Sequence, residues 1–237
     1  MNNKMYQFLL FVQPIFYISI VKGISLANKT EIKKIAILNS ALISMVSFSL
    51  YSCGSILFME KRRGTLELLI AAPQPLWKSI FYRALSYTIV SIISLIETIT
   101  VAVLALDVTY NFSIGSFLLS LLMLILSISV LGCYFSIIFG FSINSFELQN
   151  LFLNPLLIII GIFTVKAKFI EIVGKINPMS ISIFNFKETL LQGLNSLTLR
   201  ELVHWLVLII LFFTLFIKLT DIIEAKIRLS GRYHEFN

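Results

Sequence analysis

The stretch Glu60–Trp77 reads EKRRGTLELLIAAPQPLW and decides how the chain around it is organised. It joins one long apolar run, 35–59, to another, 79–106, and it contains five charged residues, one glycine and two prolines. A segment that only connected two membrane helices would not need this arrangement of charges and helix breakers. We therefore expect the segment to have a function of its own.

The composition of the whole chain is that of a membrane protein. Apolar residues make up 58% of its 237 residues, charged residues only 13%, and the mean hydropathy is +0.94, whereas soluble domains carry about 25% charged residues. Helices of about 20 apolar residues are long enough to cross the roughly 30 Å of hydrocarbon in a bilayer. The sequence predicts an all-α, polytopic membrane protein that forms a single domain over 1–237, with six transmembrane helices at about 5–21, 35–59, 79–106, 114–139, 148–165 and 202–219.

Basic residues indicate the orientation of these spans through their local density. Their totals on the two sides nearly balance, but the tightest cluster, Lys61–Arg63, directly follows the second span. Because basic residues close to span ends favour the cytoplasmic side, we place this cluster, and with it both termini, in the cytoplasm. The net charge of +7 is then explained by contact with anionic headgroups. No stripe of basic and aromatic residues indicates nucleic-acid binding.

The first half of the quoted stretch predicts a turn followed by a short helix. Arginine or lysine in hydrocarbon costs about 2.5–3.5 kcal/mol, so the second span is expected to end at Met59, before the charged run. Gly64 then allows the chain to change direction. Thr65 is a candidate N-cap, and Glu67 in the first turn suits the positive end of the helix dipole.

The second half predicts where this helix ends and which face it buries. Pro73 disfavours helical geometry in the residue before it, and Pro75 repeats the stop, so the helix has about two turns. Trp77 marks the return to the headgroup level, and Lys78 and Arg83 are expected to extend their charges outward along the third span. The apolar residues on one side of the helix are Leu66, Leu69 and Ile70. A short helix clamped between two spans is suited to transmit force from a soluble partner into the membrane.

This segment resembles the coupling helix of the ABC-2 type permease family, an element that docks on an ATP-binding subunit. The similar features are a charged run, Gly-Thr-Leu-Glu, two leucines, a proline and a further aromatic residue. Weaker similarities are Gly161–Phe163 near the far end of the fifth span and Asn177–Pro178 before the next helix. The docking element that the resemblance implies consists of Glu60, Lys61, Arg62, Arg63, Gly64, Thr65, Leu66, Glu67, Leu68, Leu69, Pro73, Pro75 and Trp77.

The resemblance also implies partners. Six spans form half of a pathway, so it implies two permease subunits, identical or related, together with two ATP-binding cassette ATPases. ATP and Mg²⁺ are expected on those ATPases and no cofactor on this chain. One departure concerns the amino terminus. Family members usually begin with an amphipathic connecting helix, whereas only Met1–Lys4 precedes the first span, so the docking cleft that this helix normally completes is expected to be reduced.

The longest segment outside the predicted spans, 166–201, is half apolar and is expected to lie on or dip into the outer leaflet. Asn177–Pro178 is a turn signal. The residues that follow, Met179–Gln192, are predicted to form a surface or re-entrant helix that ends at Gly193, with Lys187 on its polar side.

Three smaller features surround that helix. Gly161–Phe163 is consistent either with a hinge or with close helix packing. Thr198 and Glu201 have the spacing of a capping box that starts the last span. The final residues, Asp221–Asn237, are predicted to form a short charged tail.

Glu97 is the only acidic residue well inside a predicted span, so its carboxylate is expected to face protein or water rather than lipid. Asn39 and Gln13 are candidate partners on other spans. Two roles remain open for Glu97: it lines the pathway and binds a cationic substrate, or it is a hydrogen-bonding post between helices. Cys53 and Cys133 lie inside apolar runs without metal or disulfide spacing, which predicts simple packing roles.

These features favour an export permease of a bacterial plasma membrane. The expected substrate is an amphipathic peptide antibiotic, drug or lipid-linked molecule, and haem and polysaccharide stay open as alternatives. The chain lacks the Gly-x-x-x-x-Gly-Lys-[Ser/Thr] phosphate loop, so ATP hydrolysis is assigned to a separate subunit. An intramembrane enzyme is disfavoured because only His204 and His234 are available and no Gly-x-Ser-x-Gly or His-Glu-x-x-His motif is present. A scaffold or sensor without transport is the other alternative, and it predicts no ATPase partner.

Overall fold

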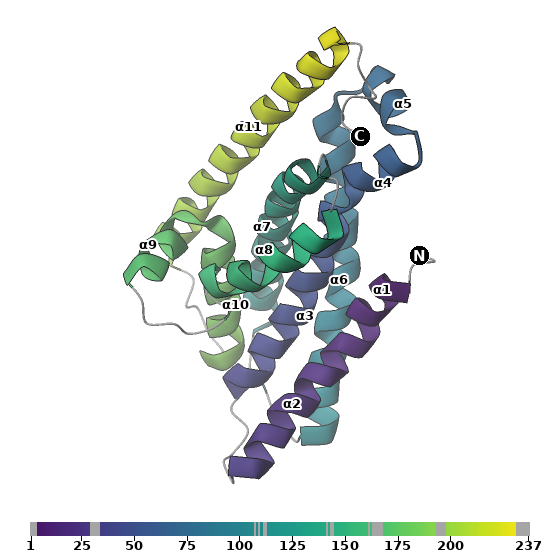
Figure 1. Cartoon of the computed structure of the whole chain (residues 1–237). Helices are drawn as coiled ribbons and strands as arrows, with labels where there is room; N and C mark the ends of the chain where they lie inside the picture. Colours follow the sequence, from purple (N-terminus) through teal and green to yellow (C-terminus); the bar gives the residue numbers. More distant parts are fainter. Residues whose placement is uncertain are drawn as a thin grey trace.

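The part of the chain that the computed structural model describes contains helices and no strands. It comprises residues 4–28, 34–106, 113–140, 145–160, 168–192 and 198–230, with the single positions 108, 110, 142 and 162. The elements are α1 (Lys4–Gln7), the π-helical segment η1 (Phe8–Val12), α2 (Gln13–Asn28), α3 (Lys34–Gly54), α4 (Ile56–Arg62), α5 (Leu66–Ala71), α6 (Leu76–Leu106), α7 (Ile114–Gly140), α8 (Ser145–Ile159), α9 (Lys168–Ile176), α10 (Pro178–Gln192) and α11 (Leu199–Ser230). Figure 1 shows them as a bundle with α5 at one end.

Four stretches of helix are long and apolar enough to cross a membrane: Lys34–Arg62, Leu76–Leu104, Ile114–Gly140 and Leu199–Arg228. They correspond to the second, third, fourth and sixth predicted spans. The first predicted span lies on a shorter apolar helix, Phe8–Ile24. The fifth lies on α8, whose 15 residues rise only about 22 Å. The all-helical membrane fold is confirmed, and a count of six crossings stays a prediction.

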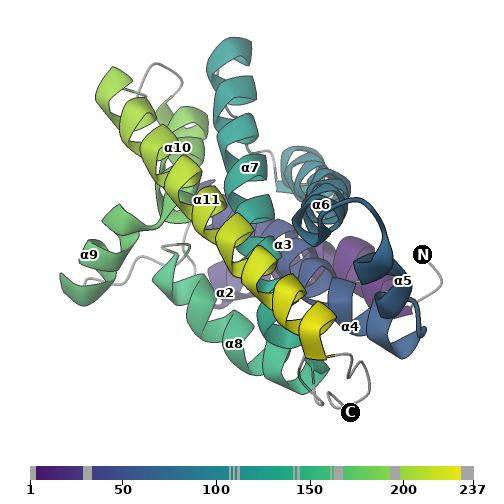
Figure 2. The same ribbon diagram turned by 90° about the horizontal axis from the view of Figure 1, so that it is seen from above.

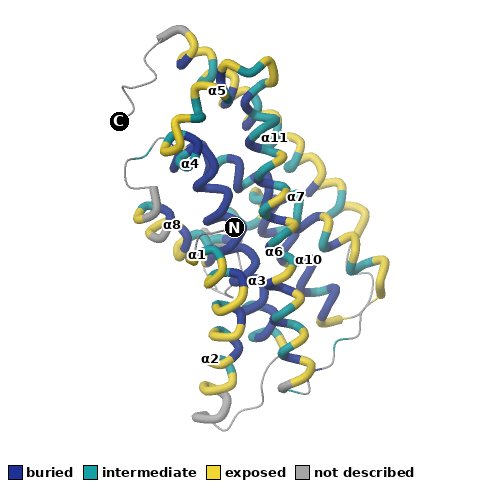
Figure 3. The backbone as a smooth tube through the Cα atoms, turned by 90° about the vertical axis from the view of Figure 1, so that its right-hand side faces the viewer, coloured by how far each residue is buried: buried dark blue, intermediate teal, exposed yellow. Residues whose placement is uncertain are grey.

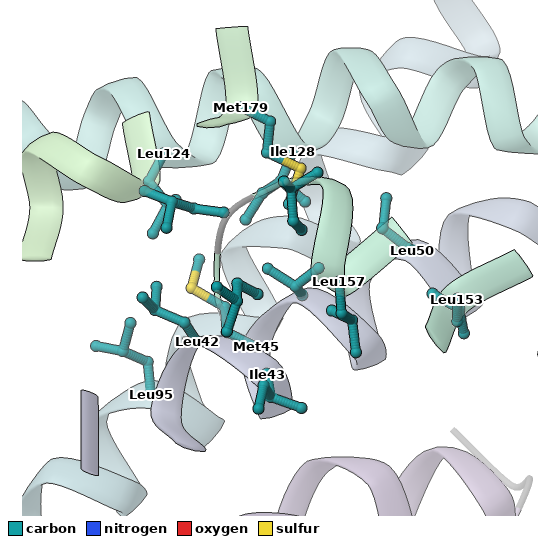
Figure 4. Packing of buried hydrophobic residues seen from close by; sticks show 14 of the residues in the cluster. Leu42, Ile43, Met45, Leu50, Leu95, Leu124, Ile128, Leu153, Leu157 and Met179 are labelled. Atoms are coloured by element: carbon teal, nitrogen blue, oxygen red, sulfur yellow. The ribbon is translucent and has the colours of Figure 1, made fainter. Parts of the chain in front are cut away.

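Helix α3 is the centre of the bundle. Its side chains are buried all round from Ile37 onward, apart from Asn39, as expected for a helix surrounded by other helices. Figure 3 shows this helix in dark blue between the more exposed α2 and α11. In Figure 4, residues of α6, α7, α8 and α10 converge on Leu42 and Met45 of α3.

Small residues allow neighbouring helices to approach this centre closely. Ser49 of α3 shares a 2.8 Å hydrogen bond with Thr88 of α6. A Cβ atom at Gly132 of α7 would lie 2.7 Å from the sulfur of Cys53, and one at Gly140 would lie 2.5 Å from Cβ of Leu57. Such close contacts through glycine and serine are typical of helix packing in membranes. Cys53 is fully buried in this packing, and so is Cys133 on α7, which confirms their packing roles.

Helix α10 corrects the prediction of a surface helix. It packs against α7 and α11, and Lys187, placed on its polar side, is buried with its Nζ donating to the carbonyl of Ile162 at 2.8 Å. Burial lowers the pKa of Lys187 to about 8. The sequence pattern was weak because both faces of the helix mix polar and apolar residues. The re-entrant alternative stays a prediction. The predicted helix end at Gly193 lies outside the described residues. So does the Gly161–Phe163 feature, except for Ile162.

Helix α11 starts as predicted and ends later. Thr198 and Glu201 form a reciprocal capping box: the Thr198 N–H donates to Glu201 Oε2 at 3.1 Å, and the Glu201 N–H donates to Thr198 Oγ1 at 3.3 Å. The prediction of a charged tail from Asp221 is wrong as far as Ser230, because α11 continues to that residue and brings its charged end to α5. Figure 2 shows this end beside α4 and α5.

Candidate functional site

The turn between α4 and α5 is set by Gly64. Helix α4 runs to Arg62, so the helix extends past the expected end at Met59. Gly64 has a φ of 69°, its N–H donates to the Lys61 carbonyl at 3.0 Å, and the next N–H, of Thr65, donates to the Glu60 carbonyl at 3.0 Å. This pair of bonds is a Schellman motif, which ends a helix on a left-handed glycine. The predicted change of direction at Gly64 is confirmed.

The extra turn of α4 places Glu60 at the centre of the site. Its carboxylate is buried and receives two hydrogen bonds: one from Thr65 Oγ1 to Oε2 at 2.5 Å and one from Arg83 Nη1 to Oε1 at 2.6 Å. The predicted capping role of Thr65 is therefore wrong, because its hydroxyl bonds to Glu60 and makes no cap hydrogen bond to α5. Arg83 likewise points to Glu60, which ties α6 to the end of α4 and the start of α5.

Helix α5 is held to the spans by one face. Ile70 is only 1% exposed. Leu66 and Leu69 are partly buried against a hydrophobic cluster that includes Leu76 of α6. This confirms the predicted apolar face. The opposite edge of α5 and the following loop are open: Leu68 is 71% exposed, and the other exposed residues are Glu67, Ala71, Pro73 and Gln74. We call these five residues the outer edge of α5.

The prolines end α5 as predicted. Ala72, before Pro73, is extended with a ψ of 149°, and α6 then begins at Leu76, three residues before the predicted start of the third span. The ring of Trp77 packs edge-on against Phe213 of α11, with ring centres 5.9 Å apart. The predicted place of Trp77 at the headgroup level stays a prediction. Pro75 is partly buried at this joint.

The basic residues before the turn have different exposures. Arg62 and Arg63 are exposed, and Lys61 is half-buried. They lie at the same end of the molecule as the outer edge of α5 (Figure 1). The sequence-predicted docking residues therefore come together at one end of the bundle.

The polar residues predicted inside the spans do not pair with one another. Glu97 Oε2 and Asn39 Oδ1 are buried without a hydrogen-bond partner in the described part of the chain. Gln13 donates instead to Tyr17 on its own helix at 3.0 Å, and its Oε1 is also without a partner there. Glu97 Oε2 is therefore a buried acceptor that no described side chain satisfies.

Sequence reasoning missed two contributions to the site. For Arg83 it predicted only a charge that extends outward along the third span, and not the hydrogen bond to Glu60. Glu224 and Arg228 were placed in a tail, yet both hydrogen-bond to the ends of the loop after α5. The sequence does carry a signal for the second pair. A glutamate four residues before an arginine favours a helix, and no glycine or proline interrupts 199–230.

Comparison with known families decides what this arrangement belongs to. A family model described as ABC-2 type transporter matches residues 1–191, which include α1 to α9, the whole α4–α5 turn and α10 except its last residue. The chain belongs to the ABC-2 type transporter family. No curated protein and no solved structure matches the chain.

Membership in the ABC-2 type transporter family makes the chain a membrane subunit of an ABC transporter, a transport protein rather than a catalytic one. Among the residues described, no group of three histidine, cysteine, aspartate or glutamate side chains is placed to hold a metal ion. Helix α11 lies outside the residues that the family model matches.

Proposed function

We propose that this chain is the permease of an ATP-driven exporter and that an ATP-binding subunit docks on the outer edge of α5. The observation that carries the proposal is the two-sided construction of α5: Ile70 is fixed in the bundle while Leu68, two residues before it, is open. An exposed leucine beside Glu67 on a helix held at one end of the spans is suited to enter a groove on a soluble protein.

The contacts of α5 also support force transmission. Through Glu60 the turn is tied to Arg83 on α6, and through its apolar face it is packed on Leu76. A displacement of α5 therefore moves the ends of α4 and α6 rather than a flexible loop. Rigid-body movement of helices around an interface is a common form of switching.

The larger assembly follows from family membership. ABC-2 permeases normally work with ATP-binding cassette ATPases, so we propose two permease copies or related chains, two ATPases that hold ATP and Mg²⁺, and six crossings for each permease. The α4–α5 turn and the end of α11 lie at one end of the bundle. We assign that end to the cytoplasm, together with both termini, in a bacterial plasma membrane.

For the substrate we propose an amphipathic molecule: a peptide antibiotic, a drug or a lipid-linked compound. The spans offer apolar side chains and the single carboxylate of Glu97, whose Oε2 lacks a partner in the described part of the chain. These groups suit an apolar ligand with a positive charge.

The docking proposal is tested by co-expression with the ATP-binding subunit encoded nearest to this chain in its genome. Leu68→Arg is expected to lower co-purification and stimulated ATP hydrolysis at least about tenfold, the effect of losing one well-packed contact residue. Leu199→Arg is the matched control, because Leu199 is 82% exposed at the other end of α11. Leu69→Arg is unsuitable, since Leu69 packs on the bundle.

Two outcomes of this experiment contradict the proposal. One is a Leu68→Arg chain that binds and stimulates the ATPase as well as the unchanged chain does. The other is an unchanged chain, correctly folded in the membrane, that binds no ATP-binding subunit, the result that a scaffold or sensor predicts.

A further inference from the structure

The charged end of α11 contacts both ends of the loop that joins α5 to α6. Arg228 Nη2 donates to the carbonyl oxygen of Ile70 at 2.9 Å, near the end of α5. Glu224 Oε2 accepts from the N–H of Leu76, the first residue of α6, at 2.9 Å. The two side chains are one helical turn apart and bind each other, with Arg228 Nη2 and Glu224 Oε1 separated by 2.6 Å.

Both backbone groups lack a partner within their own helices. The last carbonyls of a helix and its first N–H groups have no intrahelical partner, and the prolines at 73 and 75 offer no N–H to the loop. The bond from the Arg228 guanidinium to a free carbonyl and the bond from a free N–H to the Glu224 carboxylate are both charge-assisted. Charge-assisted hydrogen bonds are about twice as strong as neutral ones. The pair is therefore matched in chemistry to the two sites that it occupies.

Apolar packing reinforces the same joint. Ile227, between the two charged residues, is 5% exposed, and Ile223 packs on the cluster that contains Leu69 and Trp77. The side chain of Glu224 is only 12% exposed, whereas that of Arg228 is 51% exposed. The neighbouring charged residues of this turn, Asp221 and Lys226, are exposed.

We infer that the Glu224–Arg228 pair positions α5, and that α11 is a strut which carries displacement of α5 into the last span. The first part concerns this chain alone. The second part rests on the proposed function, since it assumes that an ATP-binding subunit displaces α5. Helix α11 is then moved from its cytoplasmic end at the same time as α4 and α6.

The simplest alternative is a pair that stabilises only α11 through its i to i+4 spacing. A charge exchange separates the two readings. In the double variant Glu224→Arg with Arg228→Glu, the ion pair can form again, but an arginine cannot accept from the Leu76 N–H and a glutamate cannot donate to the Ile70 carbonyl. The exchange therefore restores a local ion pair and not the contacts to the loop.

The first test is hydrogen exchange on the purified full-length chain in lipid nanodiscs, read in peptides over 66–80 and, as an internal reference, over 205–220. Glu224→Ala and the charge exchange are each expected to speed exchange of the Leu76 amide about tenfold, since both remove the acceptor of its hydrogen bond. Arg228→Ala is expected to speed exchange over 66–80 because it removes the bond to the Ile70 carbonyl at the end of α5. The reference segment is expected to stay unchanged. Lys226→Ala is the matched control and is expected to change neither segment.

Exchange over 66–80 that is unaffected by the alanine variants would overturn the inference, and so would full restoration by the charge exchange. The second test measures the strut with the co-expressed ATP-binding subunit. Glu224→Ala and Arg228→Ala are expected to keep most of the co-purification but to lose at least about half of the transport per ATP hydrolysed, the behaviour of a positioning pair. Unchanged coupling in these variants would contradict the strut. If no ATP-binding subunit associates, the proposed function fails, and the exchange experiment still decides whether the pair positions α5.

Discussion

Glu60 connects three segments of the proposed docking element through a single carboxylate. Its two oxygens accept from Thr65, before α5, and from Arg83, on α6. Removing one partner of a buried ion pair costs about 3–5 kcal/mol, and less here because the side chain of Arg83 is 41% exposed. The position of α5 therefore depends on a few polar contacts as well as on apolar packing.

Glu97 is a second residue whose surroundings suggest a role. A hydrogen-bonding post between helices needs a partner, and Glu97 Oε2 has none in the described part of the chain. We expect Glu97→Gln and Glu97→Leu to fold as well as the unchanged chain or better, because burying a carboxylate at membrane depth costs on the order of 2–3 kcal/mol. Both are expected to reduce export of a cationic dye several-fold. Thermal unfolding in one detergent and dye efflux from vesicles measure the two effects.

The two variants distinguish the roles of Glu97. Normal efflux with Glu97→Gln removes the residue from the pathway. A marked loss of thermal stability in Glu97→Leu alone supports the structural post instead.

The residue types at these sites were predictable from sequence, and their partners were not. The charged run and the lone acidic residue in a span stood out because such residues are costly in hydrocarbon. A pairing such as Glu60 with Arg83, 23 positions apart, depends on how two helices align, and sequence polarity alone does not specify that alignment.

At the scale of elements, the turn before α5 rests on a backbone conformation that favours glycine. Gly64 has a positive φ, and no atom lies within 4 Å of a Cβ placed there. Gly64→Ala is expected to destabilise this turn by about 1–2 kcal/mol through backbone strain alone. Gly23→Ala is a suitable control, since Gly23 is helical, its Cβ would also be in open space, and alanine favours a helix by about 1 kcal/mol.

Limited proteolysis of the 60–76 segment and thermal unfolding in detergent measure these effects. Faster cleavage is expected with Gly64→Ala and not with Gly23→Ala. Equal cleavage rates in the Gly64→Ala and unchanged chains would contradict the importance of the left-handed conformation.

Local signals predicted several element boundaries well. The prolines at 73 and 75 ended α5, and the capping box at Thr198 started α11. The end of α11 was missed because a fall in hydropathy after Leu219 was read as the end of the helix, although a helix that leaves the bilayer can continue on its own side-chain pairs. The burial of α10 was missed because it depends on packing against α7 and α11, which lie far away in sequence.

At the scale of the whole molecule, α5 is a short helix at one end of the bundle that is buried on one face and exposed along its outer edge. Helices α4, α6 and α11 all contact the α5 segment, through packing, the Glu60 contacts and the Glu224–Arg228 pair. The membrane fold and the family were predictable from composition and from one motif. The number of crossings stays a prediction, because the fifth predicted span, 148–165, extends beyond the end of α8 at Ile159 into residues outside the described part of the chain.

The most direct test of the account is a cross-link between α5 and the ATP-binding subunit. Both native cysteines are replaced by alanine, and a benzophenone probe is attached to Leu68→Cys, to Ile70→Cys as the buried control, or to Leu199→Cys as the exposed control at the other end of α11. Irradiation of membranes is expected to join the subunit to the chain at position 68 and not at positions 70 or 199. No product at position 68, or as much product at position 199, would contradict docking on the outer edge of α5.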